Sequence, residues 1–236
     1  MTFKEIVPEL RTLAVVLAGG TGQRIGSEVP KQLIEIGGRP ILSYAVEAFD
    51  TFPGVDEIVV VMAPGFGDAA RAIVAPYPKV RAVIDGGTSR TDSTVNALAF
   101  LAGEADDARV LFHDAARPFV DHEIIGRCVT ALESFKAVAV GQPVSDTIVG
   151  VSGGFVSAMT DRSELVRFQT PQGFRLGTIR KAYELALADP AFQATDDCGV
   201  VHRYLPDVPI PVVAGSERNL KVTHPLDIQI AEHLTR

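Results

Sequence analysis

Short apolar runs rich in β-branched residues alternate with amphipathic stretches in the first part of the chain, and this alternation restricts the fold more than any other feature. Five runs are expected to be strands: 13–17, 58–62, 80–84, 109–112 and 137–140. The stretches between them have helical spacing: 41–49, 68–74, 93–101 and 124–132. Continuous apolar strands separated by helices are typical of a parallel sheet covered on both faces. With right-handed crossovers, we predict an α/β fold with a doubly wound, mostly parallel twisted sheet.

The pattern changes between about residues 143 and 167. Residues 146–149 and 155–156 flank a stretch with glycines at both ends, which predicts a hairpin that protrudes from the sheet as a β-arm. A helix at about 176–188, a strand near 210–213 and a helix at about 225–234 complete the main layer. Because we find no internal repeat and no linker-like tract, we expect residues 1–236 to form one domain with this excursion.

Composition limits the partners. A net charge of -7 argues against a general nucleic-acid or anionic-membrane surface. No apolar run approaches the ~18 residues of a membrane span, and the first residues lack the basic-then-apolar pattern of a signal peptide. The two cysteines, Cys128 and Cys198, lack metal-ligand spacing and indicate a reducing compartment. We therefore expect a cytoplasmic protein with no nucleic-acid or membrane partner.

A glycine-rich loop, residues 17–26, directly follows the first predicted strand. Its glycines allow the backbone to approach a ligand and expose N–H groups toward an anion. Arg24 and Lys31 add two cations, which predicts a cradle for a triphosphate. The spacing matches neither the P-loop nor the dinucleotide fingerprint. The plainer alternative is a flexible strand-to-helix turn with solvated cations.

The run His113-Asp114-Ala115-Ala116-Arg117-Pro118 ends the fourth predicted strand. Ligands of doubly wound sheets bind beyond the carboxyl ends of the strands, so Asp114 is expected at the same edge as the glycine-rich loop. A carboxylate there suits Mg²⁺ bound to phosphate oxygens, and Arg117 suits a phosphate or a neighbouring carboxylate. A structural Asp–Arg pair is the alternative. We interpret His113 as a hydrogen-bonded core residue without a catalytic role.

Residues 86–93 follow the third predicted strand. Their backbone and the Ser93 hydroxyl suit the edge of a nucleobase, whereas a helix cap formed by Thr91, Asp92 or Ser93 is an equally good interpretation. Four later segments offer cations or hydroxyls for a second phosphate or a polyol, although each alone favours a structural role: 160–162, 168–174, 195–197 and 219–223. Residues 195–197 are explained equally well as a helix N-cap with acidic residues in the first turn.

These segments, in this order, resemble the 2-C-methyl-D-erythritol 4-phosphate cytidylyltransferases of the non-mevalonate isoprenoid pathway. The resemblance extends from Leu13 to about Leu234 and includes Gly-x-Gly-x-Arg with Pro-Lys-Gln, His-Asp-Ala-Ala-Arg-Pro, Gln-Thr-Pro-Gln and Lys-Val-Thr. It implies a Rossmann-like nucleotidyltransferase that uses CTP and Mg²⁺, releases pyrophosphate and forms a homodimer through its arm.

The resemblance also implies roles for individual residues. Charge at the reacting phosphates is assigned to Arg24, Lys31 and Lys221. The nucleotide site comprises Ala18, Gly87, Thr88 and Ser93 around cytosine and ribose, with Gly19, Gly20 and Gly22 of the loop. Asp114 and Thr195 match positions near the hydroxyls of methylerythritol phosphate. Thr147, Arg162 and Thr170 match positions that bind its phosphate group, some of them supplied by the partner subunit. Arg117 is expected beside this phosphate.

No protein nucleophile is needed, because the acceptor's own phosphate is ionised and attacks the α-phosphorus of CTP. Two positions depart from many of these enzymes. The chain has Leu17-Ala18-Gly19-Gly20 where they have Pro-Ala-Ala-Gly, and Thr88 where they often have an acidic residue. Leu-Ala-Gly-Gly is more usual in ribitol 5-phosphate cytidylyltransferases, so ribitol 5-phosphate or another alditol phosphate is an alternative acceptor. A non-catalytic nucleotide-binding module is a remote alternative, since Arg24, Lys31, Asp114 and Lys221 occur together.

Overall fold

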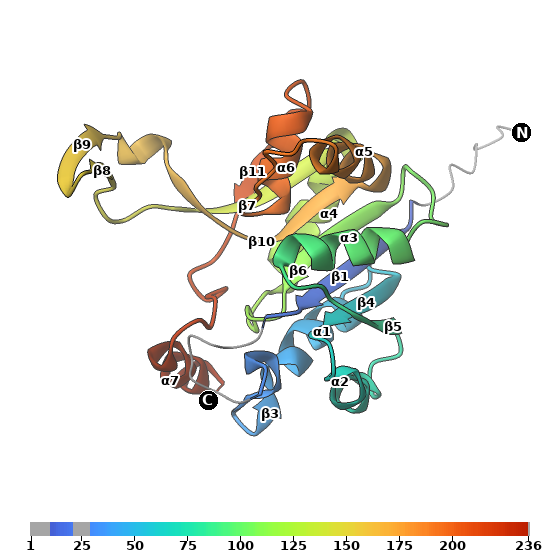
Figure 1. Cartoon of the computed structure of the whole chain (residues 1–236). Coiled ribbons are helices and arrows are strands. Elements are labelled where there is room, and N and C mark those ends of the chain that lie inside the picture. The colour runs from blue at the N-terminus through green and yellow to red at the C-terminus, as the bar shows by residue number, and fades with distance from the viewer. Residues whose placement is uncertain (1–9, 21–28, 236) are drawn as a thin grey trace, which may run out of the picture.

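A seven-stranded sheet forms the centre of the computed structural model, which describes residues 10–20 and 29–235 (Figure 1). Its strands are β1 (Thr12–Ala18), β4 (Glu57–Met62), β5 (Val80–Asp85), β6 (Arg109–Asp114), β7 (Ala137–Pro143), β10 (Val166–Arg175) and β11 (Val212–Ala214). Their spatial order is β11-β7-β10-β6-β1-β4-β5, and β10 alone runs antiparallel to its neighbours. The predicted mostly parallel α/β fold is confirmed.

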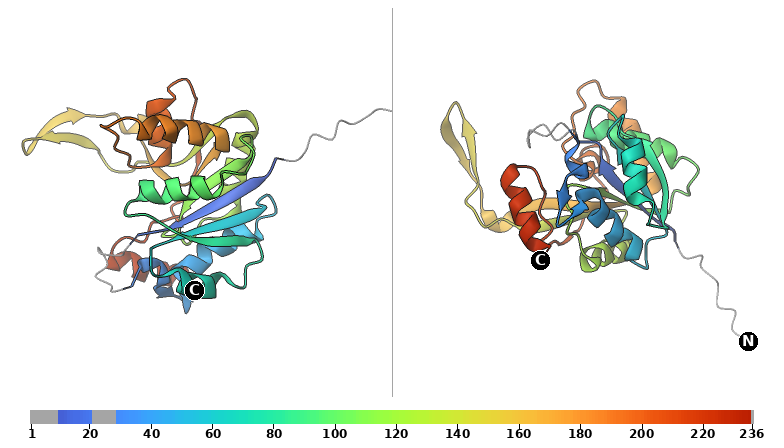
Figure 2. Two further views of the ribbon diagram at one scale, coloured as in Figure 1. Left: turned by 45° about the vertical axis from the view of Figure 1, so that its right-hand side comes forward. Right: turned by 90° about the horizontal axis from the view of Figure 1, so that it is seen from below.

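Helices cover both faces of the sheet (Figure 2). One apolar core joins the sheet to α1 (Ile41–Thr51), α2 (Gly67–Val74) and α4 (His122–Ser134), and the other joins it to α3 (Arg90–Phe100), α5 (Leu176–Leu187) and α6 (Asp197–Tyr204). Alternate residues of a strand point to opposite faces. In β1, Ala14 and Val16 accordingly pack in the first core, and Leu13 and Val15 pack in the second.

A third apolar cluster lies where the short pair β2 (Glu35–Ile36) and β3 (Arg39–Pro40) meets α7 (Pro225–Leu234). It packs Ile36 and Ile41 against Val222 and Ala231. The chain that leads into α7 is thereby fixed beside the segment that follows the glycine-rich loop.

Strand register places three loops at one edge of the sheet. Leu17 of β1 lies beside Asp114 of β6, and Ala18 lies beside Met62 of β4, which in turn lies beside Asp85 of β5. The loops that leave β1, β5 and β6 therefore emerge together at the carboxyl edge, where a doubly wound sheet binds its ligands.

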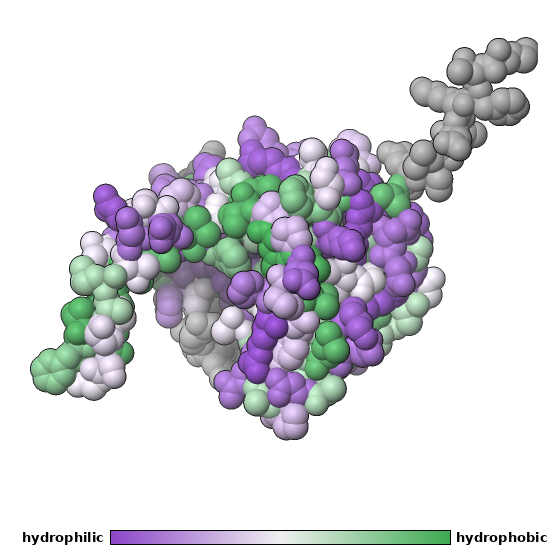
Figure 3. Space-filling view, turned by 90° about the horizontal axis from the view of Figure 1, so that it is seen from above, coloured by the Kyte–Doolittle hydropathy of each residue, from purple (hydrophilic) through white to green (hydrophobic). Residues whose placement is uncertain are grey.

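The predicted hairpin is present as β8 (Val149–Ser152) with β9 (Phe155–Met159), followed by the 3-10 turn η3 (Arg162–Glu164). Its first strand begins at 149 rather than at 146, because the turn needs only Gly153 and Gly154. Gly153 and Gly154, at the turn, have φ of 59° and 84°, a conformation that favours glycine. The hairpin projects well away from the body (Figure 1). Apolar side chains are exposed on it, with Phe155 79% and Met159 72% exposed, and the protruding hairpin shows green, apolar surface in Figure 3. Among the described residues, no helix has the length and apolar character that would let it cross a membrane.

Two expectations need correction. Helix α3 begins at Arg90 rather than at 93, because Ser89 is its N-cap: the Ser89 hydroxyl accepts a hydrogen bond from Asp92 N, and the Asp92 carboxylate accepts one from Ser89 N. None of the three predicted caps occupies that position. Strand β10 was not expected from the sequence. The alternative of an N-cap at 195–197 is confirmed, because Asp196 caps α6 and its side chain accepts a hydrogen bond from Gly199 N.

Candidate active site

A pocket of about 360 Å³ opens at the carboxyl edge of the sheet. It is lined by residues of five chain segments: Leu17, Gly19, Gly20, Lys31, Gln32, Thr88, Ser89, Arg90, Ser93, Asp114, Ala116 and Lys221. Glycines, hydroxyls, cations and one carboxylate, far apart in the sequence, therefore meet around one cavity. The pocket brings together seven of the predicted site residues: Gly19, Gly20, Lys31, Thr88, Ser93, Asp114 and Lys221.

The glycine-rich loop leaves β1 directly over this pocket. Ala18 is fully buried at the end of the strand. A Cβ atom on Gly19 would lie 2.8 Å from the Ser93 hydroxyl oxygen, so the loop approaches α3 more closely than a side chain would allow. Gly22 and Arg24 lie outside the described residues.

Lys31 is held firmly. It begins the 3-10 turn η2 (Lys31–Leu33), is only 8% exposed, and its Nζ donates to the carbonyl oxygen of Val222 at 2.9 Å. Val222 N donates to Ala116 O at 2.8 Å, which ties the same segment to the loop after β6. Lys31 thus links two parts of the pocket wall with its ammonium group at the cavity.

Asp114 lies between two cations. Lys221 Nζ contacts its Oδ2 at 2.7 Å, and Arg90 Nε lies 3.5 Å from its Oδ1. Burial by itself would raise the pKa of Asp114, but the charges of Lys221 and Arg90 outweigh it and lower this pKa well below its usual value. Asp114 is consequently an anion at neutral pH.

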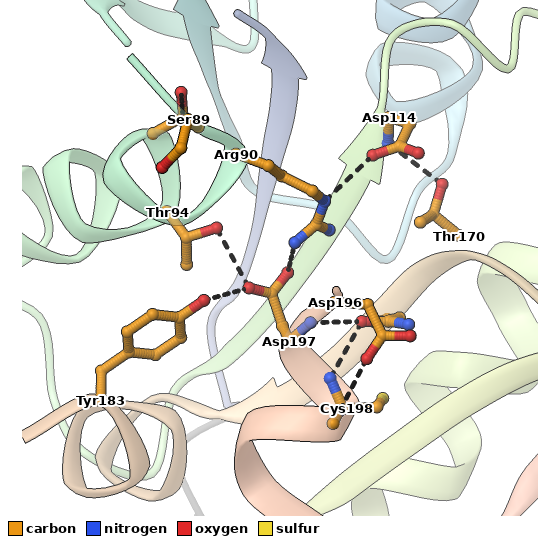
Figure 4. A network of polar contacts seen from close by, with 12 residues as sticks. Ser89, Arg90, Thr94, Asp114, Thr170, Tyr183, Asp196, Asp197 and Cys198 are labelled. Carbon is orange, nitrogen blue, oxygen red and sulfur yellow. Dashed lines mark hydrogen bonds and ion pairs between the residues drawn. The ribbon is translucent and has the colours of Figure 1, made fainter. Parts of the chain in front are cut away.

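Arg90 and Asp197 belong to the same network, although neither was among the site residues predicted from the sequence (Figure 4). Arg90 Nη1 contacts the fully buried Asp197 Oδ2 at 2.8 Å. Burial opposes the charged form of Arg90, but the Asp197 and Asp114 carboxylates outweigh it and raise the pKa of Arg90. The sequence signal for Arg90 was a cation within the glycine-containing segment 86–93, which follows β5 at the edge where the sheet binds ligands.

The loop after β5 is shaped by the start of α3. Ser93 Oγ accepts from Gly87 N at 3.2 Å and donates to Ser89 O at 3.0 Å, and Thr88 Oγ1 donates to the Asp92 carboxylate at 2.6 Å. A Cβ atom on Gly87 would lie 2.0 Å from Asp92 Cβ, so this position requires glycine. The residues that cap α3 therefore also form part of the pocket wall.

His113 is fully buried behind Asp114, as expected for a core residue. Its Nε2 is 3.0 Å from Arg117 O, and its Nδ1 is 3.1 Å from Thr170 Oγ1, which in turn accepts from Asp114 N. Burial lowers the pKa of His113 to about 4. A neutral His113 ring that donates to Arg117 O and accepts from the Thr170 hydroxyl satisfies this series of hydrogen bonds. Thr170, only 5% exposed, thereby supports the backbone of Asp114.

Arg117 lies in a neighbouring pocket of about 550 Å³, which Lys221 also lines, together with Arg167 and Phe168. Arg117 Nη1 donates to Asn219 O at 2.8 Å, and its guanidinium also contacts Phe168 O at 3.4 Å. Its interactions are with backbone carbonyls, and they fix the loop after β6 against the segment that carries Lys221.

Three predicted acceptor residues lie elsewhere in the chain. Thr147 and Arg162 are exposed on the arm, where Arg162 Nη1 donates to Ser145 O at 3.1 Å. Thr195 is exposed just before α6 and borders neither of these two pockets. Within one chain, the structure does not bring Thr147 and Arg162 to the pocket.

The donor set bears on a metal. Within the described part of the chain, no group of three or more His, Cys, Asp or Glu side chains could hold a metal ion. Mg²⁺, however, commonly uses one or two carboxylates and completes its shell with water and substrate phosphates. Asp114, a permanent anion on the pocket wall, fits that mode of binding.

Comparison with known proteins agrees with this site. The family model described as IspD, 2-C-methyl-D-erythritol 4-phosphate cytidylyltransferase, matches residues 12–236. The enzyme of that name from Thermobifida fusca is 49% identical over 233 residues, covering 96% of this chain and 94% of the relative. A bifunctional ribulose 5-phosphate reductase/CDP-ribitol pyrophosphorylase from Haemophilus influenzae is 36% identical, covering 95% of this chain and 48% of that protein.

Among solved structures, the 4-diphosphocytidyl-2C-methyl-D-erythritol synthase of Anaerococcus prevotii superimposes with a TM-score of 0.86. It is 29% identical, and the match covers 97% of each chain. Sequence and fold therefore agree over almost the whole length, and the chain belongs to the 2-C-methyl-D-erythritol 4-phosphate cytidylyltransferase family.

Proposed function

We propose that this protein transfers the cytidylyl group of CTP to 2-C-methyl-D-erythritol 4-phosphate, forming 4-diphosphocytidyl-2-C-methyl-D-erythritol and pyrophosphate. The observation that carries the proposal is the meeting of Lys31, Lys221 and Asp114 with the glycine-rich loop in one pocket. The family to which the chain belongs is that of 2-C-methyl-D-erythritol 4-phosphate cytidylyltransferases, so we assign CTP and this phosphate to the pocket as substrates.

The reaction needs electrostatics rather than a protein nucleophile. A phosphate oxygen of the acceptor forms a bond to the α-phosphorus of CTP, the bond from that phosphorus to the bridging oxygen breaks, and the electron pair leaves with pyrophosphate. Two anions approach each other, so the protein's task is to position them and to stabilise the charge of the transition state. The fixed ammonium of Lys31 and the more exposed ammonium of Lys221 are assigned to this task, with Arg24 as the third cation.

The nucleotide is assigned to the side of the pocket formed by the β1 and β5 loops. Ala18, Gly19, Gly20 and Gly22 would surround the base and the phosphates with backbone groups. Gly87, Thr88 and Ser93 would complete the base and ribose site, supported by the hydrogen bond between Gly87 N and Ser93 Oγ.

Asp114 would orient the acceptor and, with phosphate oxygens, hold Mg²⁺. When bound, the metal would neutralise phosphate charge. Both Asp114 oxygens face cations in this structure, and Lys221, whose side chain is 39% exposed, is free to turn from Asp114 toward the phosphates.

A homodimer would complete the acceptor site. Thr147 and Arg162 lie on an arm that projects from its own body and carries exposed apolar residues (Figure 3). Arm packing against a second copy would bury these residues and bring Arg162 to the partner's pocket, where it would bind the acceptor phosphate beside Thr170 and Arg117. Thr195 stays assigned, with Asp114, to the acceptor hydroxyls. Because both cysteines are free, we also propose the reducing cytoplasm as the location.

Ribitol 5-phosphate is the second candidate acceptor, and a specific observation favours it. The Haemophilus influenzae relative is named a CDP-ribitol pyrophosphorylase in part, and this chain carries Leu17-Ala18-Gly19-Gly20 in its nucleotide loop. The methylerythritol reading rests on higher identity over a fuller length, 49% against 36%.

Pyrophosphate release separates these candidates. The purified protein is incubated with Mg²⁺, CTP and either acceptor phosphate, with UTP and ATP as nucleotide controls. We expect kcat/KM to be highest for CTP with 2-C-methyl-D-erythritol 4-phosphate. Higher kcat/KM with ribitol 5-phosphate would replace the first acceptor by the second, and no pyrophosphate with any pair would overturn the proposed function.

A further inference from the structure

Arg90 is a partly buried cation of the pocket, and the transfer step assigns it no role. It is the first residue of α3, where the helix dipole disfavours a positive charge, so other groups must hold it there. In Figure 4 the guanidinium lies between Asp197 and Asp114, at 2.8 Å from one carboxylate and 3.5 Å from the other. Arg90 therefore connects the nucleotide loop to the acceptor side of the pocket.

Asp197 is the fixed end of this connection. It is fully buried, and its Oδ1 accepts from Thr94 Oγ1 at 3.0 Å and from Tyr183 Oη at 2.6 Å. Its backbone N donates to Gln172 Oε1 at 3.1 Å, which fixes the start of α6 to β10. A buried carboxylate needs a cation, and among the residues that the structure describes Arg90 supplies it.

Asp114 is the end that faces substrate. Its other cation, Lys221, is more exposed than Arg90, with 39% of the side chain accessible against 27%. If Lys221 turns toward the nucleotide phosphates, Asp114 loses its shortest ion pair. Arg90, tied to Asp197, stays in place and still faces Oδ1 of Asp114.

We propose that Arg90 is a positioning residue: anchored by the buried Asp197, it holds the Asp114 carboxylate at the acceptor side of the pocket while Lys221 serves the nucleotide phosphates. The inference rests on the proposed function, because it assigns the acceptor to Asp114. It makes acceptor binding depend on a residue that extends from the nucleotide loop.

Two variants separate positioning from simple stability. In Arg90→Lys a single ammonium replaces a guanidinium that contacts two carboxylates, so the fold is kept while Asp114 is released. We expect kcat/KM for the acceptor to fall roughly 100-fold, as for a misplaced catalytic group, with KM for CTP changed less than about threefold. In Arg90→Gln/Asp197→Asn both charges are removed together, so no buried charge is left unpaired and the unfolding temperature should stay near that of the wild type.

The double variant decides the question. If Arg90 positions Asp114, this variant folds normally but keeps the lowered kcat/KM for the acceptor. If the network is only structural, the variant recovers the wild-type kcat/KM for the acceptor together with thermal stability, and the proposal is wrong. Arg180→Lys is the matched control, since Arg180 pairs with Asp106 away from the pocket and its side chain is 24% exposed.

A second readout does not depend on turnover. Crystal structures of the wild type and the double variant should show the Asp114 carboxylate rotated toward Lys221 in the variant alone. An unchanged Asp114 would overturn the role of Arg90, even if the wild type released no pyrophosphate and the proposed function itself failed.

Discussion

At the scale of single residues, the two lysines of the pocket differ in how freely they move. Lys31 is buried and bonded to Val222 O, whereas Lys221 is more exposed and paired with Asp114. A fixed cation stabilises developing charge without having to reorganise, which is the more effective arrangement in a transition state. Lys31 should therefore contribute mainly to kcat.

Replacing Lys31 by alanine tests this assignment. Loss of one well-placed donor typically costs on the order of 10²–10³ in rate, so we expect kcat for pyrophosphate release to fall by that factor. Lys181→Ala is the control, because Lys181 forms an exposed pair with Glu184 on α5. Near-normal kcat in a folded Lys31→Ala protein would remove Lys31 from the mechanism.

His113 makes folding stability depend on pH. Its pKa is about 4 in the folded chain against 6.5 for a free side chain, because burial disfavours the charged ring. Between these values the unfolded chain binds a proton that the folded chain does not, so the free energy of unfolding falls as pH falls from 6.5 to 4 and levels off below. The loss is on the order of 3 kcal/mol, at 1.36 kcal/mol for each pKa unit.

Urea unfolding of the wild type and His113→Gln across this pH range measures that contribution. Other groups titrate equally in both proteins, so the difference between their curves isolates His113. We expect the wild type to lose stability more steeply than the variant as pH falls. Parallel curves would show that His113 is not the neutral buried ring described above.

At the scale of elements, the sequence predicted the parallel strands well and missed β10. A strand covered on both faces is recognisable in the sequence because burial alone requires an apolar residue at almost every position. In β10 the buried positions include Gln169, Thr170 and Gln172, and Pro171 breaks the pattern further, since proline is unusual inside a sheet. These polar side chains are buried because each finds a partner far away in the sequence, as Gln172 does at Asp197 N.

The same reason limited prediction of the site. Asp114, Lys31 and Lys221 were found through motifs, and the structure brings all three to one pocket. Arg90 was passed over because its partner, Asp197, lies more than a hundred positions away and is buried on another helix. A cation's role is set by its partner, and local sequence does not identify a distant partner.

The N-terminal cap of α3 forms part of the nucleotide loop, which couples an element to the site. Ser89→Ala removes the acceptor for Asp92 N and should cost about 1 kcal/mol of stability. We also expect KM for CTP to rise several-fold, because Gly87 and Thr88 depend on the same turn. Asp121→Ala is the matched control, since Asp121 caps α4 in the same manner and lines neither pocket. Equal KM values for the two variants would contradict the coupling.

At the scale of the whole molecule, the proposed acceptor site would be divided between two chains. The body has Lys31, Asp114 and Lys221 at its pocket, and the arm of the second chain would supply Thr147 and Arg162. A two-fold dimer would repeat this exchange, so each arm would complete the other chain's pocket. Burial of exposed Phe155, Val156 and Met159 would stabilise the assembly in proportion to the apolar area removed from water.

Complementation between two inactive variants tests the division. Lys31→Ala is defective in the body and Arg162→Ala in the arm, and each alone should have little activity. After joint refolding of equal amounts, about half of the dimers would be mixed, and each mixed dimer would contain one intact pocket and one doubly defective pocket. We therefore expect roughly a quarter of wild-type activity to return. Activity that stays at the level of the separate variants would place Arg162 in its own chain's site, or outside the site altogether.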